Sequence, residues 1–159
     1  MLADSLAGKT AMVKSLDTVQ GETPPPLPYN LLKLQSEASR QFVLLPDQVK
    51  EITQTLREKH RLITYNRSDC QYLSDEQHAD GPAVIASIEA NIPGLDLYAA
   101  MADPAIKSRA FNSSKVSAHH AIIPTQSRVD SASLSENERR IYELIATAYL
   151  VQFMPAHTW

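Results

Sequence analysis

The sequence contains little cysteine, little aromatic surface and no long apolar run, and each scarcity excludes a class of protein. Cys70 is the only cysteine among 159 residues, which excludes an internal disulfide and argues against a thiolate zinc site. Aromatic residues make up 6%, so extensive base-stacking platforms are not expected. No run approaches the roughly 20 apolar residues that span a bilayer, and residues 1–11 lack the order of a signal peptide. We therefore expect a soluble intracellular protein without a membrane partner.

The rest of the composition is that of an ordinary folded domain. Hydrophobic residues account for 43% and charged residues for 21%, which excludes collagen-like, coiled-coil and wholly disordered chains. A length of 159 residues predicts one compact domain, or one domain with fragments of a neighbour at its ends.

The net charge of −3 conceals two basic segments separated by an acidic one. Residues 57–67 hold four basic side chains against one acid, and residues 105–128 hold four more with no acid and two adjacent histidines. Between them, residues 69–103 hold seven acids and no lysine or arginine. Scattered solvated charge and a basic cleft that attracts phosphate both explain this pattern, so charge alone leaves the two interpretations open.

Apolar spacing and capping signals predict helices in the first half of the chain. Residues 23–28 must run extended because of their prolines. Residues 30–41 form a first helix with asparagine at its cap, and residues 46–58 form a second helix that proline opens. Residues 62–65 switch to β-branched and aromatic side chains, the composition of a short strand. This order of elements resembles a winged-helix arrangement.

Two capping boxes predict further helices in the second half. Residues 74–77 begin a helix that the Gly-Pro pair at 81–82 interrupts and restarts. Residues 112–124 are expected to form a loop that enters a short buried segment. Residues 135–138 begin the longest helix, which ends near Pro155. One face of that helix is predicted to be buried and comprises Ile141, Leu144, Ile145, Ala148 and Val151.

The end of the predicted strand and the residues that follow it contain candidates for phosphate chemistry. Tyr65 is a poor nucleophile as a free phenol with a pKa of about 10, so attack on phosphorus needs a cation nearby. Arg67 is two residues further on, and its planar guanidinium fits two phosphate oxygens. The alternative is that Tyr65 is a half-buried strand aromatic and Arg67 a surface charge, and spacing alone favours this alternative.

Two adjacent histidines, His119 and His120, lie in the second basic segment. Neighbouring residues seldom point the same way and no third ligand is placed, so no metal site is expected. We interpret one histidine as functional and the other as structural. An imidazole near a phosphate can donate a hydrogen bond or carry a positive charge.

These two segments resemble signature motifs of the type IA DNA topoisomerases. Residues 62–69 resemble the active-site tyrosine motif of that family, and residues 117–125 resemble its second signature in the same order along the chain. Residues 24–35 are similar to the segment that leads into the same domain in the bacterial topoisomerase III branch. The resemblance covers the chain from Gly8 to Pro155.

The sequence departs from the family pattern in three respects. Asn66 stands where the topoisomerase III branch usually has proline, and we expect it to loosen the tyrosine loop. Val43 stands where glycine is usual. The acidic motifs of the Toprim domain, which binds Mg²⁺ in the family, are absent. The resemblance therefore implies a piece of a longer enzyme, with Mg²⁺ held by the Toprim domain of the parent chain and no cofactor in this piece.

The resemblance implies roles for individual residues. Tyr65 is implied to be the nucleophile that forms a 5′-phosphotyrosyl bond with single-stranded DNA, without ATP. Arg67 is implied to clamp the phosphate and stabilise the transition state, and His119 to donate a hydrogen bond to it. The expected strand contacts are Gln35, Arg109, Lys115 and His120.

The expected organisation has three parts. Residues 1–28 are an extended segment from a neighbouring gate domain, residues 29–155 form the mainly α, winged-helix-like domain that bears the tyrosine, and residues 156–159 leave that domain. We expect a monomeric piece that is inactive alone, because it lacks the Toprim and other domains of the parent chain. The implied location is the cytoplasm, in association with the nucleoid.

Two rival interpretations come from other functional classes. A non-catalytic winged-helix DNA reader would place basic or amide side chains along its second helix, yet residues 48–58 mix in acids that oppose phosphate approach. The other rival is an interaction module that packs against other domains.

Overall fold

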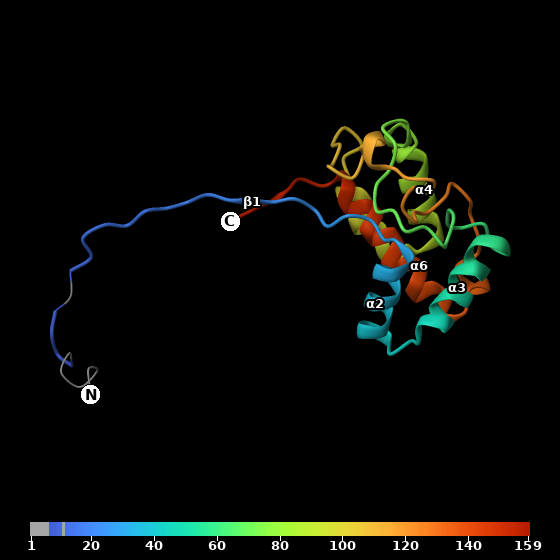
Figure 1. Ribbon diagram of the computed structural model, residues 1–159, viewed down its shortest axis with the longest axis horizontal. Helices are drawn as coiled ribbons and strands as arrows, with labels where there is room; N and C mark the ends of the chain where they lie inside the picture. The colour runs from blue at the N-terminus through green and yellow to red at the C-terminus, as the bar shows by residue number, and fades with distance from the viewer. Residues whose placement is uncertain (1–6, 11) are drawn as a thin grey trace.

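The computed structural model describes residues 7–10 and 12–159 and is mainly helical, as the sequence predicts. Figure 1 shows a helical body, an extended N-terminal arm, and a C-terminal end that lies beside that arm. No helix in these described ranges is long and apolar enough to cross a membrane. The helices and strands in chain order are β1 Glu22–Thr23, α2 Leu31–Phe42, α3 Pro46–Glu58, α4 Gly81–Asn91, α5 Asp96–Met101, α6 Glu136–Leu150 and β2 His157–Thr158. Short 3₁₀ turns are Glu76–His78, Pro93–Leu95, Ser113–Lys115, Ser131–Ser133 and Val151–Phe153.

Helices α2 and α3 pack against each other, and both begin at the signals predicted from sequence. The Asn30 side chain accepts a hydrogen bond from the Lys33 amide at 2.9 Å and so caps α2. Pro46 occupies the first position of α3. After α2, Val43 has φ 59 and ψ 30, a left-handed conformation that a β-branched residue adopts at a cost. Both predicted helices are therefore confirmed, with backbone strain at the turn that joins them.

Helix α6 packs against α2, α3 and α5. The predicted capping box is present, because Ser135 Oγ accepts from the Glu138 amide and the Glu138 carboxylate accepts from the Ser135 amide. The predicted face was partly wrong. Because α6 contacts three other helices, its buried face is wider than the predicted face and is rotated about the helix axis relative to it. Three residues of the predicted face are only half-buried: Leu144, Ala148 and Val151. The prediction omitted four buried apolar or aromatic residues: Tyr142, Ala146, Tyr149 and Leu150.

The strand predicted over residues 62–65 is reduced to a single bridge. Ile63 pairs antiparallel with Pro124 as an isolated bridge, and no continuous strand forms there. Proline has no backbone N–H, so it cannot extend a ladder of hydrogen bonds. The winged-helix comparison therefore stays a prediction, whereas the helical body is confirmed.

Residues 21–23 and the last three residues, 157–159, form a short antiparallel ribbon outside the helical body. Strand β1 pairs with β2, and Gly21 and Trp159 extend the pairing with backbone hydrogen bonds of 2.9 and 3.0 Å. A Cβ atom on Gly21 would lie 2.5 Å from the Trp159 ring, so this close approach requires glycine. Residues 21–23 of the predicted entry segment therefore lie beside the predicted exit segment, and the assignment of both segments to a neighbouring domain stays a prediction.

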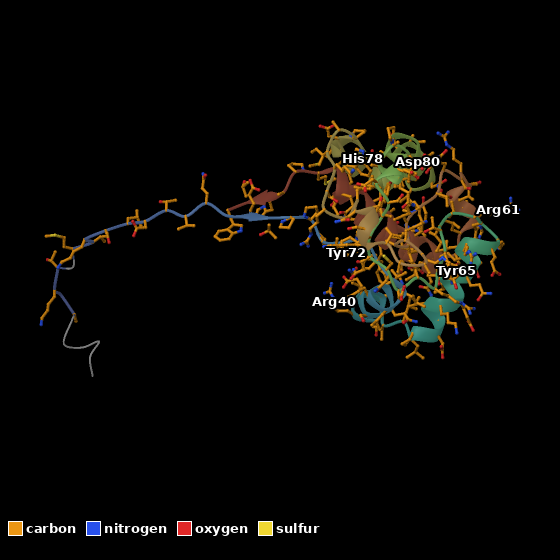
Figure 2. All side chains as sticks on the ribbon, turned by 45° about the horizontal axis from the view of Figure 1, so that its top comes forward. Arg40, Arg61, Tyr65, Tyr72, His78 and Asp80 are labelled. Atoms are coloured by element: carbon orange, nitrogen blue, oxygen red, sulfur yellow. The ribbon has the colours of Figure 1, made fainter. Side chains whose placement is uncertain are left out.

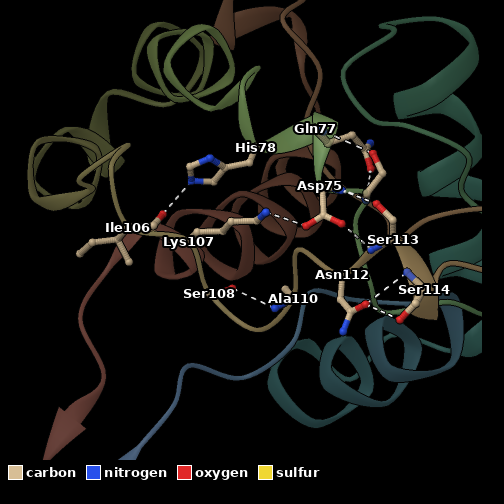
Figure 3. Close-up of polar contacts among 11 residues, drawn as sticks. Asp75, Gln77, His78, Ile106, Lys107, Ser108, Ala110, Asn112, Ser113 and Ser114 are labelled. Carbon is tan, nitrogen blue, oxygen red and sulfur yellow. Dashed lines mark hydrogen bonds and ion pairs between the residues drawn. The ribbon is translucent and has the colours of Figure 1, made fainter.

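Where a helix was predicted from residue 74, the acidic region has only the 3₁₀ turn Glu76–His78, whereas α4 begins at Gly81, where the helix was predicted to restart. Figure 3 shows how Asp75 joins this region to the loop before the two histidines. Its carboxylate accepts from Lys107 Nζ at 2.6 Å and from the Ser113 amide at 3.1 Å, and these contacts hold the pKa of Asp75 well below its usual range. Lys107 is thus paired with an acid, and its charge contributes less to the basic segment.

Candidate active site around Tyr65

The backbone brings the two motif segments together. The Thr64 amide donates to the Ile123 carbonyl at 3.0 Å, and the Thr125 amide donates to the Leu62 carbonyl at 2.9 Å. The Thr64 hydroxyl adds contacts with the backbone of Ala121 and Ile123, 57 and 59 residues away in sequence. Ile63, Ile122 and their neighbours are buried in the core, so apolar burial stabilises this pairing.

The rings of Tyr65 and His119 are in contact. Their centroids lie 4.1 Å apart with an interplanar angle of 36°. Tyr65 is half-buried, whereas His119 is exposed. This contact places a hydrogen-bond donor beside the phenol. Figure 2 labels Tyr65 close to α3.

Arg57 is a neighbour of Tyr65 that the sequence analysis did not single out. Its guanidinium carbon lies 4.7 Å from the centroid of the Tyr65 ring, the geometry of a cation–π contact. Arg57 lies in the last turn of α3, and the chain reverses at Arg61, whose φ is 57, so that Tyr65 returns beside the helix. The sequence places Arg57 in the first basic segment, but it does not reveal that Arg61 is left-handed. That conformation turns the chain back and brings Tyr65 to Arg57.

Arg67 is exposed and its guanidinium is directed to α3. Its Nη2 donates to Gln54 Oε1 at 3.3 Å, and Gln54 Nε2 donates in turn to the Glu58 carboxylate at 3.2 Å. No hydrogen bond joins Arg67 to Tyr65 or His119 in the part of the chain that the structure describes. The structure therefore brings Tyr65 and His119 into contact, whereas the Arg67 guanidinium is held against Gln54 of α3.

Asn66 anchors the tyrosine loop, contrary to the expectation that it loosens the loop. Its side chain is 1% exposed, and Nδ2 donates to the Thr53 hydroxyl of α3 at 3.2 Å. Thr53 is fully buried and donates to the Lys50 carbonyl at 2.9 Å. The amide replaces the conformational restriction of a proline with a buried hydrogen bond to a rigid helix.

A second contact fixes the chain just before the reversal. His60 Nε2 lies 3.4 Å from Glu138 Oε1, and both side chains are almost fully buried. Burial favours the neutral carboxyl of Glu138, but the hydrogen bonds from Ser135 and the proximity of His60 outweigh it and lower the pKa of Glu138. The end of α3 is thereby tied to the start of α6, close to where the chain turns toward Tyr65.

Lys115 lies two residues before the second motif segment, and His120 lies within it. Lys115 Nζ lies 4.9 Å from the Tyr72 ring centroid, beside a shallow pocket of about 330 Å³ that Asp69, Tyr72 and Lys115 help to line. His120 is half-buried, and its Nδ1 lies 2.7 Å from the Ala121 carbonyl. This contact engages one ring nitrogen of His120, while His119 is the exposed histidine of the pair.

The other two predicted strand contacts are Gln35 and Arg109. Gln35 on α2 is half-buried, and its amide donates to the Pro46 carbonyl at 3.0 Å, which braces the turn between α2 and α3. Arg109 is exposed in the loop after α5. A DNA contact by either residue stays a prediction.

Side chains that could ligate a metal ion do not form a cluster in the described part of the chain. Among residues 7–10 and 12–159, no three His, Cys, Asp or Glu side chains converge as a possible ligand set.

Comparison with known proteins connects this geometry to one family. A family model described as DNA topoisomerase matches residues 1–159. DNA topoisomerase 3 of Vibrio cholerae is 43% identical over 155 residues, which are 98% of this chain and 24% of that protein. DNA topoisomerase 3 of Salmonella typhimurium is 42% identical over 154 residues, 97% of this chain and 23% of that protein. The chain thus spans about a quarter of the length of these curated relatives.

A solved structure shares the fold. Full-length topoisomerase I from Thermotoga maritima superimposes with a TM-score of 0.59 and 21% sequence identity, over 88% of this chain and 22% of that one. At this identity the comparison supports the mainly helical architecture alone.

Proposed function

The chain belongs to the type IA DNA topoisomerases, and from this premise we propose that it is the domain that cleaves and rejoins one DNA strand through Tyr65. The substrate of the proposed reaction is single-stranded DNA. The observation that supports this proposal most strongly is the pairing of the two motif segments, which brings His119 to the ring of Tyr65.

The proposed step is a transesterification at one phosphate. The Tyr65 oxygen forms a bond to phosphorus, the bond from phosphorus to the 3′ oxygen breaks, and the DNA 5′ end remains attached to the protein. The phenolic proton leaves Tyr65, and the released 3′ oxygen takes up a proton. Rejoining is the reverse attack by the 3′ hydroxyl, so the bond energy is conserved and no ATP is needed.

Three side chains have proposed roles at that phosphate. Tyr65 is the nucleophile, and His119 donates a hydrogen bond to a non-bridging oxygen from its position beside the phenol. Arg67 neutralises the negative charge that develops on the phosphate oxygens. Its contact with Gln54 holds the guanidinium against α3, the helix whose Arg57 contacts the Tyr65 ring. The exposed state of Arg67 and His119 is compatible with contact by a strand from solvent.

We propose that the strand extends from Tyr65 along the second motif segment. His120 lies on that segment, and Lys115 and Arg109 precede it, so their positive or polar side chains would contact neighbouring phosphates. Gln35 has the weakest support because its amide already binds the Pro46 carbonyl.

The rest of the catalytic machinery is proposed to lie in other parts of a longer protein. Mg²⁺ would be held there by a Toprim domain, and no step described above passes through it. We therefore propose that this chain alone neither relaxes supercoiled DNA nor cleaves a single strand. Mg²⁺-dependent cleavage by the chain alone would show that the additional domain is dispensable.

The test uses the longer protein with an end-labelled single strand. Denaturation after incubation should leave a 3′-end label attached to the protein, whereas a 5′-end label should leave with a fragment that ends in a 3′ hydroxyl. The Tyr65→Phe variant should bind the strand and form no adduct. Attachment of the 5′-labelled fragment, or an adduct in the Tyr65→Phe variant, would contradict the proposal.

A further inference from the structure

The contact between Arg57 and Tyr65 suggests a role for a residue outside both motifs. We propose that Arg57 is a positioning residue, which holds the Tyr65 ring through its face so that the phenolic oxygen points to the scissile phosphate. The inference rests on the proposed function of Tyr65. It adds a third group, from α3, to the two motif segments that build the site.

The base of Arg57 is rigid. Leu56 and Thr53, which precede it on α3, are fully buried, and α3 packs against α6. The guanidinium therefore extends from a fixed helical turn and lies 4.7 Å from the ring centroid of Tyr65. Tyr65 itself lies on an irregular segment between the Ile63 bridge and the turn at Asn66, so its backbone restrains the ring less than a strand would.

The Tyr65 hydroxyl is left available for reaction. No hydrogen bond to this hydroxyl is present within residues 7–10 and 12–159, so the ring is held by its contacts with Arg57 and His119. A contact through the ring face restricts the side-chain rotamer without occupying the oxygen. This arrangement is the one that a nucleophile needs, because an oxygen already engaged with a donor must break that contact before it attacks.

The charge of Arg57 is also uncompensated. No carboxylate forms an ion pair with it in the described part of the chain, and the adjacent Glu58 accepts from Gln54 instead. A phosphate at Tyr65 would therefore meet a cation on the ring in addition to Arg67. Lysine at this position would keep the charge but lose the flat surface that stacks on an aromatic ring.

The contact is tested first in this chain, by NMR with Tyr65 labelled on its ring carbons. Arg57→Leu should shift the Tyr65 ring resonances and broaden or average them, because the ring gains rotational freedom. Lys50→Leu removes the same charge two turns earlier on the exposed surface of α3 and should leave these resonances in place. Unchanged Tyr65 resonances in Arg57→Leu would overturn the inference.

The consequence for reaction is tested in the longer protein, as the single-turnover rate of strand cleavage at saturating DNA. Arg57→Leu should slow cleavage by about two- to thirtyfold, the range that a cation–π contact provides. Arg57→Lys should recover DNA affinity and only part of the rate. Lys50→Leu should stay within about twofold of the unchanged protein, because a charge about 10 Å away is largely screened at physiological salt.

The outcomes separate the inference from the proposed function. A wild-type cleavage rate in Arg57→Leu, or full recovery of the rate by lysine, would refute a positioning role for the planar group. Tyr65→Phe serves as the second control. If that variant still forms an adduct, the proposed function fails, and the NMR comparison still decides whether Arg57 positions the ring. A circular dichroism melt confirms that each variant is folded.

Discussion

Substitution of Asn66 by alanine tests how the tyrosine loop is held on α3. The Asn66 amide is buried and donates to the buried Thr53 hydroxyl at 3.2 Å. Its removal deletes the hydrogen bond, leaves a small cavity, and leaves one acceptor position of Thr53 without a partner. A buried polar group that loses its partner costs about 1–3 kcal/mol, so Asn66→Ala should lower the free energy of unfolding by that amount.

A double-mutant cycle isolates the hydrogen bond from the cavity. Thr53→Val deletes the hydroxyl at nearly constant volume and leaves the Asn66 amide unpaired, which should cost about 1–3 kcal/mol as well. The double variant should be more stable than the sum of the single changes predicts, by about 1 kcal/mol, because the second change removes a group that has already lost its partner.

The assay is urea unfolding followed by circular dichroism, with the slope checked for constancy across the variants. Thr55→Val on the same helix is the matched control. Its hydroxyl donates to the Glu51 carbonyl at 3.1 Å on the partly exposed side of α3, so its loss should cost less than about 0.5 kcal/mol. A loss below about 0.5 kcal/mol for Asn66→Ala, together with simple additivity, would refute the anchor.

Three further predictions concern stability and DNA affinity. Val43→Gly should raise the free energy of unfolding by about 0.5–1 kcal/mol in urea titrations, because glycine relieves the left-handed strain at φ 59; a loss of stability would contradict this account of the turn. Burial raises the pKa of Tyr142 to about 12 from 10.0, so the unfolded chain releases this proton first. Its stabilising contribution is complete below pH 10.0 and is lost as the pH rises toward 12, by roughly 3 kcal/mol, and Tyr142→Phe should flatten unfolding free energies measured across that window. Single-stranded DNA should bind this chain weakly, with a slope of log K against log salt of about −2 to −3 for three or four phosphate contacts; salt-independent binding, or preference for one duplex sequence, would instead favour a DNA reader.

The helices were predictable because their signals are local. Asn30, Pro46 and the Ser135 capping box fix three helix starts within a few residues, and the structure has α2, α3 and α6 at those places. The buried face of α6 was less predictable. Tyrosine is apolar along most of its ring, and Tyr142 satisfies its hydroxyl through Asn91, 51 residues away, which no local pattern reveals.

The candidate site was predictable only in part, for the same reason. The family motifs identify Tyr65 and His119, and the structure brings their rings into contact. The contributions of Arg57 and Gln54 depend on a chain reversal at Arg61, which has a positive φ without being glycine. The strand expected over residues 62–65 does not form, because Ile63 pairs with Pro124, which cannot continue a ladder of hydrogen bonds. This tertiary contact outweighs the strand propensity of residues 62–65.

The identity of the nucleophile is the central claim, and peptide mapping of a trapped adduct tests it most directly. The longer protein is incubated with a single DNA strand, denatured, and digested with nuclease and trypsin. Trypsin cuts after Arg61 and Arg67, so Tyr65 lies in the peptide Leu62–Arg67, which has no other tyrosine. The account predicts a nucleotide joined through its 5′ phosphate to Tyr65 in this peptide. An adduct on Tyr72 or on any other residue, with the Leu62–Arg67 peptide unmodified, would contradict it.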